Sequence, residues 1–141
     1  WFYSIFDHYL KWNKTQQYRM DINSIWVNEM KAGDYNPVHI HQGKLFTGLS
    51  SVMVLRLPKD FGPELTRPDQ PMNGRLQILG SVTGQFVNAD YSPQVKIGDF
   101  YVFPYDMRHV VYPFSNKKAK RRTLVCNCDI EYNPVNSRTV Q

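Results

Sequence analysis

The first twenty residues carry apolar side chains at intervals of three and four positions. In "WFYSIFDHYLKWNKTQQY" these positions are Phe2, Ile5, Phe6, Tyr9 and Leu10. Residues with that spacing lie on one face of an α-helix, so the segment predicts an amphipathic helix packed on a sheet. We expect this helix over about residues 1–20, before a core that begins at about residue 24.

From Ser24 onward the pattern changes to short runs rich in β-branched and aromatic residues, separated by Gly, Pro, Asn and Asp. Such runs predict strands joined by tight turns. The expected strands are "SIWVNEM", "KLFTGLSSVMVLRL", "GRLQIL", "GQFVN", "DFYVFP", "HVVYPF" and "RRTLVCNCDIEY". The stretch from Leu57 to Gly74 has little periodicity and is expected to be a long loop. The pattern indicates a mostly β fold: a sandwich, a jelly roll or a small barrel.

Length and composition favour one domain over residues 1–141, with a core over about 24–133. The chain has 141 residues, of which 42% are hydrophobic, and a chain of this size can form a single core. No apolar run approaches the roughly 20 residues that cross a bilayer, so we expect a soluble, cytoplasmic protein without membrane partners. Cys126 and Cys128 alternate on an expected strand and share a face, which favours reduced, packed thiols over a mutual disulfide.

The net charge of +5 is most concentrated in "KKAKRR", Lys117 to Arg122. The run is either a solvated loop between two strands or a contact for nucleic acid or another polyanion. A short cluster without a basic helix or interleaved aromatic residues is weak support for nucleic-acid binding. We therefore favour the loop.

The stretch "GDYNPVHIHQG", Gly33 to Gly43, contains two of the four histidines. On an extended strand His39 and His41 point the same way while Ile40 points oppositely. Two imidazoles on one rigid strand can supply two nitrogen ligands to a metal. The alternative is a pair of histidines that simply face solvent.

A second stretch, "KIGDFYVFPYDMRHVVYPF", favours the metal interpretation. Here a Gly-Asp turn leads into an apolar strand, a proline ends that strand, and His109 begins the next one. The two spacings, G-x5-H-x-H and G-x5-P-x4-H, are together typical of a double-stranded β-helix, the cupin-like jelly roll, in which an early strand gives two ligands and a late strand the third. We expect His39, His41 and His109 to bind one metal.

The phrases "WVNEMKAGDYNPVHIHQGKLFTGLSSV", "GDFYVFPYDMRHVVYPF" and "RRTLVCN" resemble, in order and spacing, the 2-oxoglutarate/Fe(II)-dependent oxygenases of bacteria and phages. The resemblance covers roughly Ile25 to Asn127. It implies a jelly-roll fold that holds one Fe(II), with 2-oxoglutarate as co-substrate and oxygen as oxidant. One departure is "SS" at Ser50 and Ser51, where relatives often carry tyrosines.

A dicarboxylate co-substrate needs a cation, and an arginine on a strand after His109 is the best chemical match. Arg121 and Arg122 both qualify by position, and strand alternation places them on opposite faces. The face of Arg121 also carries Thr123 and ends in an Asn that matches the family, whereas Arg122 shares its face with the cysteines. We expect Arg121 to bind the co-substrate and keep Arg122 as the alternative; both could instead be the end of the basic loop.

Five other polar residues flank these motifs. Thr123 could add a hydroxyl to the carboxylate that Arg121 holds. Asn28, on the "WVN" strand, either faces the site or satisfies nearby backbone groups. Asp106 could orient the imidazole of His109 from behind, whereas Asp34 and Asp99 are expected to form turns.

The ligand set departs from the best-known members of the superfamily, which have Asp or Glu where this chain has His41. Three-histidine sets also occur in cupin-type metal enzymes that do not use 2-oxoglutarate. The leading expectation is a 2-oxoglutarate-dependent Fe(II) dioxygenase that hydroxylates a protein side chain or small molecule. The alternatives are a cupin-type enzyme without 2-oxoglutarate and a non-catalytic jelly-roll binding module. We expect the N-terminal helix and the Leu57–Gly74 loop to shape the substrate mouth, and any homodimer to form through sheet edges.

Overall fold

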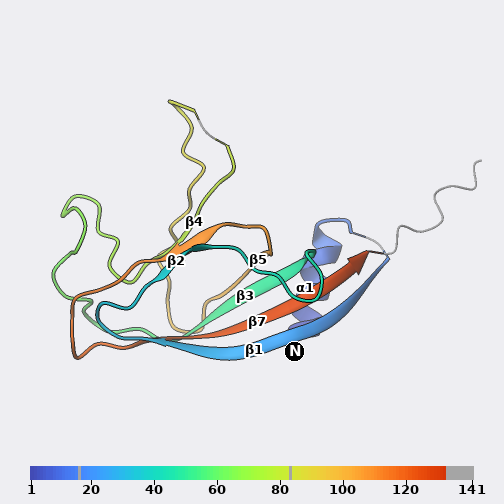
Figure 1. The fold of residues 1–141 in the computed structure, drawn as a ribbon, viewed down its shortest axis with the longest axis horizontal. Coiled ribbons are helices and arrows are strands. Elements are labelled where there is room, and N and C mark those ends of the chain that lie inside the picture. The colour runs from blue at the N-terminus through green and yellow to red at the C-terminus, as the bar shows by residue number, and fades with distance from the viewer. Residues whose placement is uncertain (16, 83, 133–141) are drawn as a thin grey trace, which may run out of the picture.

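The computed structural model describes residues 1–15, 17–82 and 84–132, and it contains two antiparallel sheets (Figure 1). The larger sheet has the strand order β1-β7-β3-β5 and the smaller has the order β2-β6-β4. The elements are α1 (Phe2–Trp12), β1 (Tyr18–Met30), β2 (Asn36–His39), β3 (Gly48–Arg56), β4 (Leu76–Ile78), β5 (Phe100–Pro104), β6 (His109–Val111) and β7 (Arg121–Tyr132). In both sheets, the earlier strands of the chain (β1 to β4) alternate with the later strands (β5 to β7). This arrangement is that of a jelly roll.

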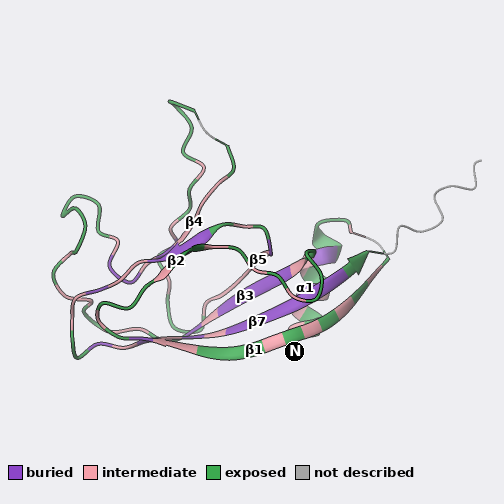
Figure 2. Ribbon diagram, viewed as in Figure 1, coloured by how far each residue is buried: buried purple, intermediate pink, exposed green. Residues whose placement is uncertain are grey.

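Strand β7 is an interior strand of the larger sheet, because it pairs with β1 on one side and β3 on the other. Eight of its twelve residues are buried (Figure 2). Its alternate side chains therefore serve two different interiors. One face packs on α1, and the other faces the smaller sheet and carries the polar residues of the site.

Helix α1 covers the outer face of the larger sheet. Its buried side chains join those of β3 and β7 in one apolar cluster: Phe6, Leu10, Leu49, Cys126, Cys128 and Ile130. Both cysteines are free and fully buried there, as the sequence predicts. With 11 residues, α1 is too short to cross a bilayer, and none of the described helices is long and apolar enough to do so.

The helix is shorter than the 1–20 predicted from sequence. It ends at Trp12, and the side-chain amide of Asn13 donates to the carbonyl of Tyr9. Strand β1 begins at Tyr18, six residues before the expected strand, because Tyr18 pairs with the far end of β7. Pairing with a strand that lies more than a hundred residues away decides this boundary, and local periodicity does not reveal it.

The expected strand over residues 84–88 is absent. This segment belongs to a projecting arm between β4 and β5 (Figure 1), and Phe86 in it is 98% exposed. None of residues 84–88 pairs with a strand of either sheet. The stretch from Leu57 to Gly74 is a loop, as predicted, with one isolated bridge between Arg67 and Gln70. The expected core end at residue 133 lies outside the described residues.

Two matching turns lead into the strands of the site region. In "KAGD" the carboxylate of Asp34 accepts the backbone N–H of Lys31, and in "KIGD" that of Asp99 accepts the N–H of Lys96. Gly33 and Gly98 have φ of 86° and 93°, a left-handed conformation that glycine adopts without strain. The two aspartates form turns, as the sequence predicts.

Candidate metal centre and binding cavity

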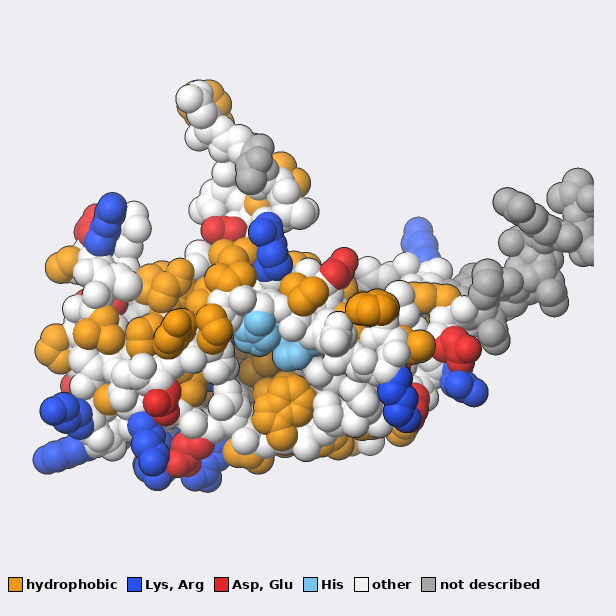
Figure 3. All heavy atoms as spheres, in the orientation of Figure 1, with side chains coloured by type: hydrophobic (Ala, Val, Ile, Leu, Met, Phe, Trp, Pro, Cys, Tyr) orange, Lys and Arg blue, Asp and Glu red, His pale blue; other side chains and the backbone are white. Residues whose placement is uncertain are grey.

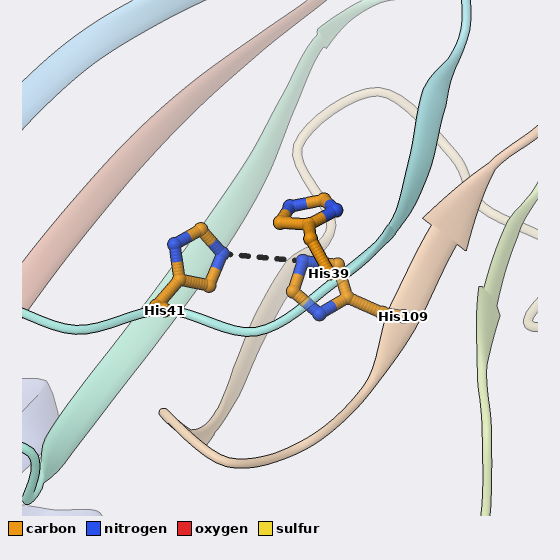
Figure 4. A group of neighbouring side chains, drawn as sticks. All are labelled: His39, His41 and His109. Carbon is orange, nitrogen blue, oxygen red and sulfur yellow. Dashed lines mark hydrogen bonds between the residues drawn. The ribbon is translucent and has the colours of Figure 1, made fainter.

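Three histidines meet between the two sheets. His39 is the last residue of β2 and lies directly opposite His109, the first residue of β6, while His41 follows two residues beyond the end of β2. One ring nitrogen from each lies within 4.8 Å of those of the other two. Figure 4 shows the three rings turned toward one another, and His41 Nε2 is 3.2 Å from His109 Nε2. Their ring nitrogens are thus close enough to bind a single ion.

The outer ring nitrogen of each histidine has its own hydrogen-bond partner. His39 Nδ1 lies 2.6 Å from the carbonyl of Pro37, and His109 Nδ1 lies 2.9 Å from the carbonyl of Met107. A carbonyl can only accept, so Nδ1 carries a proton in both rings, and the neutral form of either ring keeps a lone pair on Nε2. Metal-binding histidines in proteins are commonly held in this way.

Burial keeps two of these rings neutral. Desolvation lowers the pKa of His109 to about 4. Desolvation and then the neighbouring histidines lower the pKa of His41 to about 4 as well. Both therefore present neutral imidazole at pH 7, which is the form that binds a metal. The described carboxylates do not join this cluster, so the ligand set carries no negative charge.

The histidines line one wall of a cavity of about 330 Å³, and histidine side chains are visible in a hollow between the sheets (Figure 3). The other wall is the inner face of the larger sheet, where Asn28 pairs with Thr123 and Trp26 pairs with Val125. The full lining comprises Trp26, Asn28, Asn36, Pro37, His39, His41, Val52, Leu76, His109, Val111, Arg121, Thr123 and Val125. The cavity thus combines a donor cluster, one cation and an apolar floor.

Among the described residues that line the cavity, Arg121 is the one charged side chain. It is 1% exposed, and its Nε and Nη2 have no hydrogen-bond partner among the described residues. Desolvation lowers its pKa to about 10, so it remains a cation at pH 7. Unpaired buried guanidinium nitrogens are costly unless an anion satisfies them.

Arg122 lies on the opposite face of β7 and does not reach the cavity. Its guanidinium binds the carboxylate of Glu29, which Lys120 also contacts at 2.9 Å. The two cations lower the pKa of Glu29 to about 2. Arg122, which the sequence left as the alternative anchor for a co-substrate, therefore does not lie at the site.

Residues 24–127 match the family model described as "Putative 2OG-Fe(II) oxygenase". The chain belongs to this oxygenase family. Among curated proteins, none matches its sequence.

Solved oxygenases share the fold. One, from Burkholderia pseudomallei and titled as a 2OG-Fe(II) oxygenase family oxidoreductase, superposes with a TM-score of 0.61 at 15% identity, over 88% of this chain and 51% of that chain. A non-heme monooxygenase, solved as the ThoJ-Ni complex, superposes with a TM-score of 0.55 at 13% identity, over 80% of this chain and 46% of that one. This oxygenase chain thus spans about half the length of these structures, and at such identities the likeness concerns the fold.

Of the other polar residues predicted for the oxygenase site, some line the cavity and others do not. Thr123 is 2% exposed and lines the cavity two residues beyond Arg121, and Asn28 lines it from β1. Asp106 is exposed, and the carbonyl of Met107 holds His109 in its place. Ser51 donates to the carbonyl of Cys126 within the sheet, away from the lining.

Two elements expected at the substrate mouth do not line the cavity. Helix α1 packs on the opposite face of the larger sheet. The Leu57–Gly74 loop folds on itself, where Glu64 accepts the N–H groups of Met72 and Asn73. The cavity is instead bordered by Trp26, which is 38% exposed, and by Asn36.

Three residues of the site region were not assigned a role from sequence: Trp26, Asn36 and Asn127. The indole of Trp26 lies 6.2 Å from the ring of His41, centroid to centroid. Asn127 Nδ2 lies 3.3 Å from His41 Nδ1. Strand parity already grouped Asn127 with Arg121, but its contact with His41 depends on how the two sheets stack.

The basic run is divided among several environments. Arg121 points into the cavity, Ala119 is buried, and Lys120 and Arg122 bind Glu29. Lys117 and Lys118 remain exposed in the connection between β6 and β7. The solvated loop favoured from sequence is thus found only in part, over residues 117–120, because Arg121 and Arg122 begin β7.

Proposed function

We propose that this oxygenase uses Fe(II) and 2-oxoglutarate to hydroxylate a small molecule or a protein side chain. The observation that carries the proposal is the buried, unpaired guanidinium of Arg121 in the same cavity as the three histidines. A site with three neutral donors and one cation suits a metal together with an anionic co-substrate.

Arg121 would bind the distal carboxylate of 2-oxoglutarate. A guanidinium presents parallel N–H groups that match a carboxylate in a two-bond arrangement. Thr123 lies next on the same face of β7, where its hydroxyl can donate to the same carboxylate. Val52 and Val125 form an apolar floor that excludes water and strengthens these interactions.

The three histidines fit an iron ion by their donor chemistry. Nitrogen ligands on one side of a ferrous ion leave positions for a bidentate co-substrate and oxygen. Fe(II) held there would supply the redox chemistry that couples oxygen reduction to oxidation of the substrate. The protein would contribute the neutral ligands, the anchoring cation and a water-poor cavity. Trp26 and Asn36, on the open side, would contact the substrate.

The test is calorimetric titration of 2-oxoglutarate into anaerobic protein, with and without Mn(II) in place of Fe(II). We expect metal-dependent binding in wild-type protein. Arg121→Met should weaken it at least about 30-fold, because loss of a buried charge partner costs 2 kcal/mol or more.

Arg122→Met is the matched control, because it changes the same residue type on the neighbouring position of β7 outside the cavity. Its affinity for 2-oxoglutarate should stay within about threefold of wild type. Equal losses in the two variants, or binding that ignores the metal, would contradict the proposal.

A cupin-type metal enzyme without 2-oxoglutarate is the second candidate, favoured because none of the described carboxylates joins the three-histidine cluster. It predicts tight Mn(II) binding that Arg121→Met leaves unchanged and no heat with 2-oxoglutarate. A non-catalytic jelly-roll module predicts that neither ligand binds.

A further inference from the structure

Asn127 is placed to act on one of the three histidines. It lies on the inner face of β7 and is 4% exposed. Its Nδ2 is 3.3 Å from Nδ1 of His41. Its Oδ1 is buried and has no hydrogen-bond partner among the residues that the structure describes. Asn127 thus offers His41 a donor while an acceptor atom of the same amide stays unsatisfied.

The proton positions in the cluster follow from the contacts. His109 donates from Nδ1 to the carbonyl of Met107, so its Nε2 is an acceptor. The hydrogen in the 3.2 Å contact between the two Nε2 atoms must then belong to His41. His41 Nδ1 is therefore an acceptor, which agrees with a donating Asn127 Nδ2. His41 is thus the one ring whose inward nitrogen carries a proton.

This arrangement has to change before His41 can bind a metal. A ligating Nε2 needs its lone pair, so the ring proton must sit on Nδ1. The proton leaves Nε2 and another is gained at Nδ1 through solvent, with no net change in protonation. Nδ1–H would then face the N–H group of Asn127, and two donors cannot bond to one another.

We propose that Asn127 is a positioning residue that selects the metal-binding tautomer of His41 by a half-turn of its amide, which brings Oδ1 to accept Nδ1–H. This inference rests on the proposed metal centre. An amide suits the task because it has a donor and an acceptor on one plane. His39 and His109 need no such change, because backbone carbonyls already hold their Nδ1 protons.

The first test is the dissociation constant of Mn(II) alone, measured by calorimetry after treatment with chelator. Asn127→Leu has a similar shape but no acceptor, and it should weaken Mn(II) binding about 10–100-fold. Asn127→Asp restores an acceptor and should bind Mn(II) at least as tightly as wild type. An Asp variant as weak as the Leu variant, or a Leu variant as tight as wild type, would overturn the inference.

Cys126→Ala is the matched control for disturbance of β7. Cys126 is adjacent to Asn127 but packs in the cluster under α1 on the other face. The variant should lose stability while its Mn(II) affinity stays within about threefold of wild type. A loss of affinity as large as that in Asn127→Leu would show that strand disturbance alone explains the effect.

The second test reads the tautomer directly by ¹⁵N NMR of the histidine rings. Without metal, His41 should carry its proton on Nε2, whereas with Zn(II) the proton should sit on Nδ1. A proton on Nδ1 in both states would overturn the switch even if the metal centre is correct. A wild-type protein that binds neither Mn(II) nor Zn(II) would instead remove the metal centre itself.

Discussion

Arg121 and Arg122 are neighbours on β7, but they lie on opposite faces of the sheet and have different surroundings. Arg122 is paired with Glu29 and half-buried, whereas Arg121 is fully buried with unsatisfied nitrogens facing the cavity. The protein thus keeps a desolvated cation at the site. Such a group lowers stability unless a ligand is bound, which is a common cost of a binding site.

Replacing Arg121 should therefore stabilise the ligand-free protein. Arg121→Met removes an unpaired buried charge and keeps much of the volume, so the free energy of unfolding should rise by about 1–3 kcal/mol. Urea denaturation without metal or 2-oxoglutarate measures this. A lower free energy of unfolding in the variant would mean that the guanidinium has protein partners that stabilise it.

The neutral histidines make stability depend on pH. The pKa values of His41 and His109 fall from 6.5 in an unfolded chain to about 4 in the folded protein. Unfolding therefore takes up protons below pH 6.5. Burial of the two neutral rings makes its full contribution to the free energy of unfolding above pH 6.5. That contribution is lost as the pH falls from 6.5 toward 4.

Urea midpoints between pH 7.5 and pH 4.5, in the presence of chelator, should follow this trend. The double variant His41→Gln, His109→Gln should have a flatter profile over that range. His8→Gln changes an exposed histidine on α1 and should keep the wild-type slope. An unchanged slope in the double variant would show that other groups control the pH dependence.

At the scale of single residues, the sequence predicts which face of a strand a side chain occupies, because side chains alternate along the strand. The opposite faces of Arg121 and Arg122, and the common face of Arg121 and Thr123, follow from a period of two. The partners of the histidines do not, since Asn127 meets His41 only through the stacking of two sheets. The same holds for Trp26, which reaches the cavity from β1.

Among the elements, the connection between β2 and β3 determines where His41 lies. The backbone N–H of His41 donates to the carbonyl of Tyr105, 2.9 Å away. Further along, the carboxylate of Asp129 on β7 accepts the N–H groups of Lys44 and Leu45 and the hydroxyl of Tyr105. His41 is thus fixed by a buried network rather than by strand pairing.

Asp129→Ala should destabilise the protein by about 2–4 kcal/mol, because it leaves buried donors without an acceptor. Glu131→Ala, two residues along the same strand, removes an exposed ion pair with Arg19 and should stay within about 0.5 kcal/mol of wild type. Denaturant unfolding of both variants measures the difference. Similar losses in the two would mean that the network contributes little.

For the elements, as for the residues, the sequence predicts what a local pattern determines and misses what distant pairing determines. The strands with strong apolar patterns, such as β3, β5 and β7, are confirmed near their predicted positions. The end of α1 and the early start of β1 are not predictable from local pattern, because the pairing of Tyr18 with Tyr132 sets them. Residues 84–88 carry a strand-like pattern without a partner strand to pair with.

For the molecule as a whole, the larger sheet separates a dry core from the site. Cys126 and Cys128 lie in the core between the sheet and α1, where desolvation raises their thiol pKa values to about 11 and about 12. They should remain protonated and unreactive toward iodoacetamide at pH 8 in the folded protein. Labelling followed by mass spectrometry should show modification only as urea unfolds the chain. Rapid labelling without urea would contradict this packing.

The central place of β7 has a consequence for how the protein matures. This strand is the last of those described, yet it lies between β1 and β3 and carries Arg121, Thr123 and Asn127. During synthesis β1 and β3 therefore have no neighbour between them until β7 has left the ribosome, and chains with such distant pairings fold slowly. Before that moment the growing polypeptide lacks both the completed larger sheet and the Arg121 side chain of the cavity, so the proposed binding of metal and co-substrate must follow the synthesis of β7.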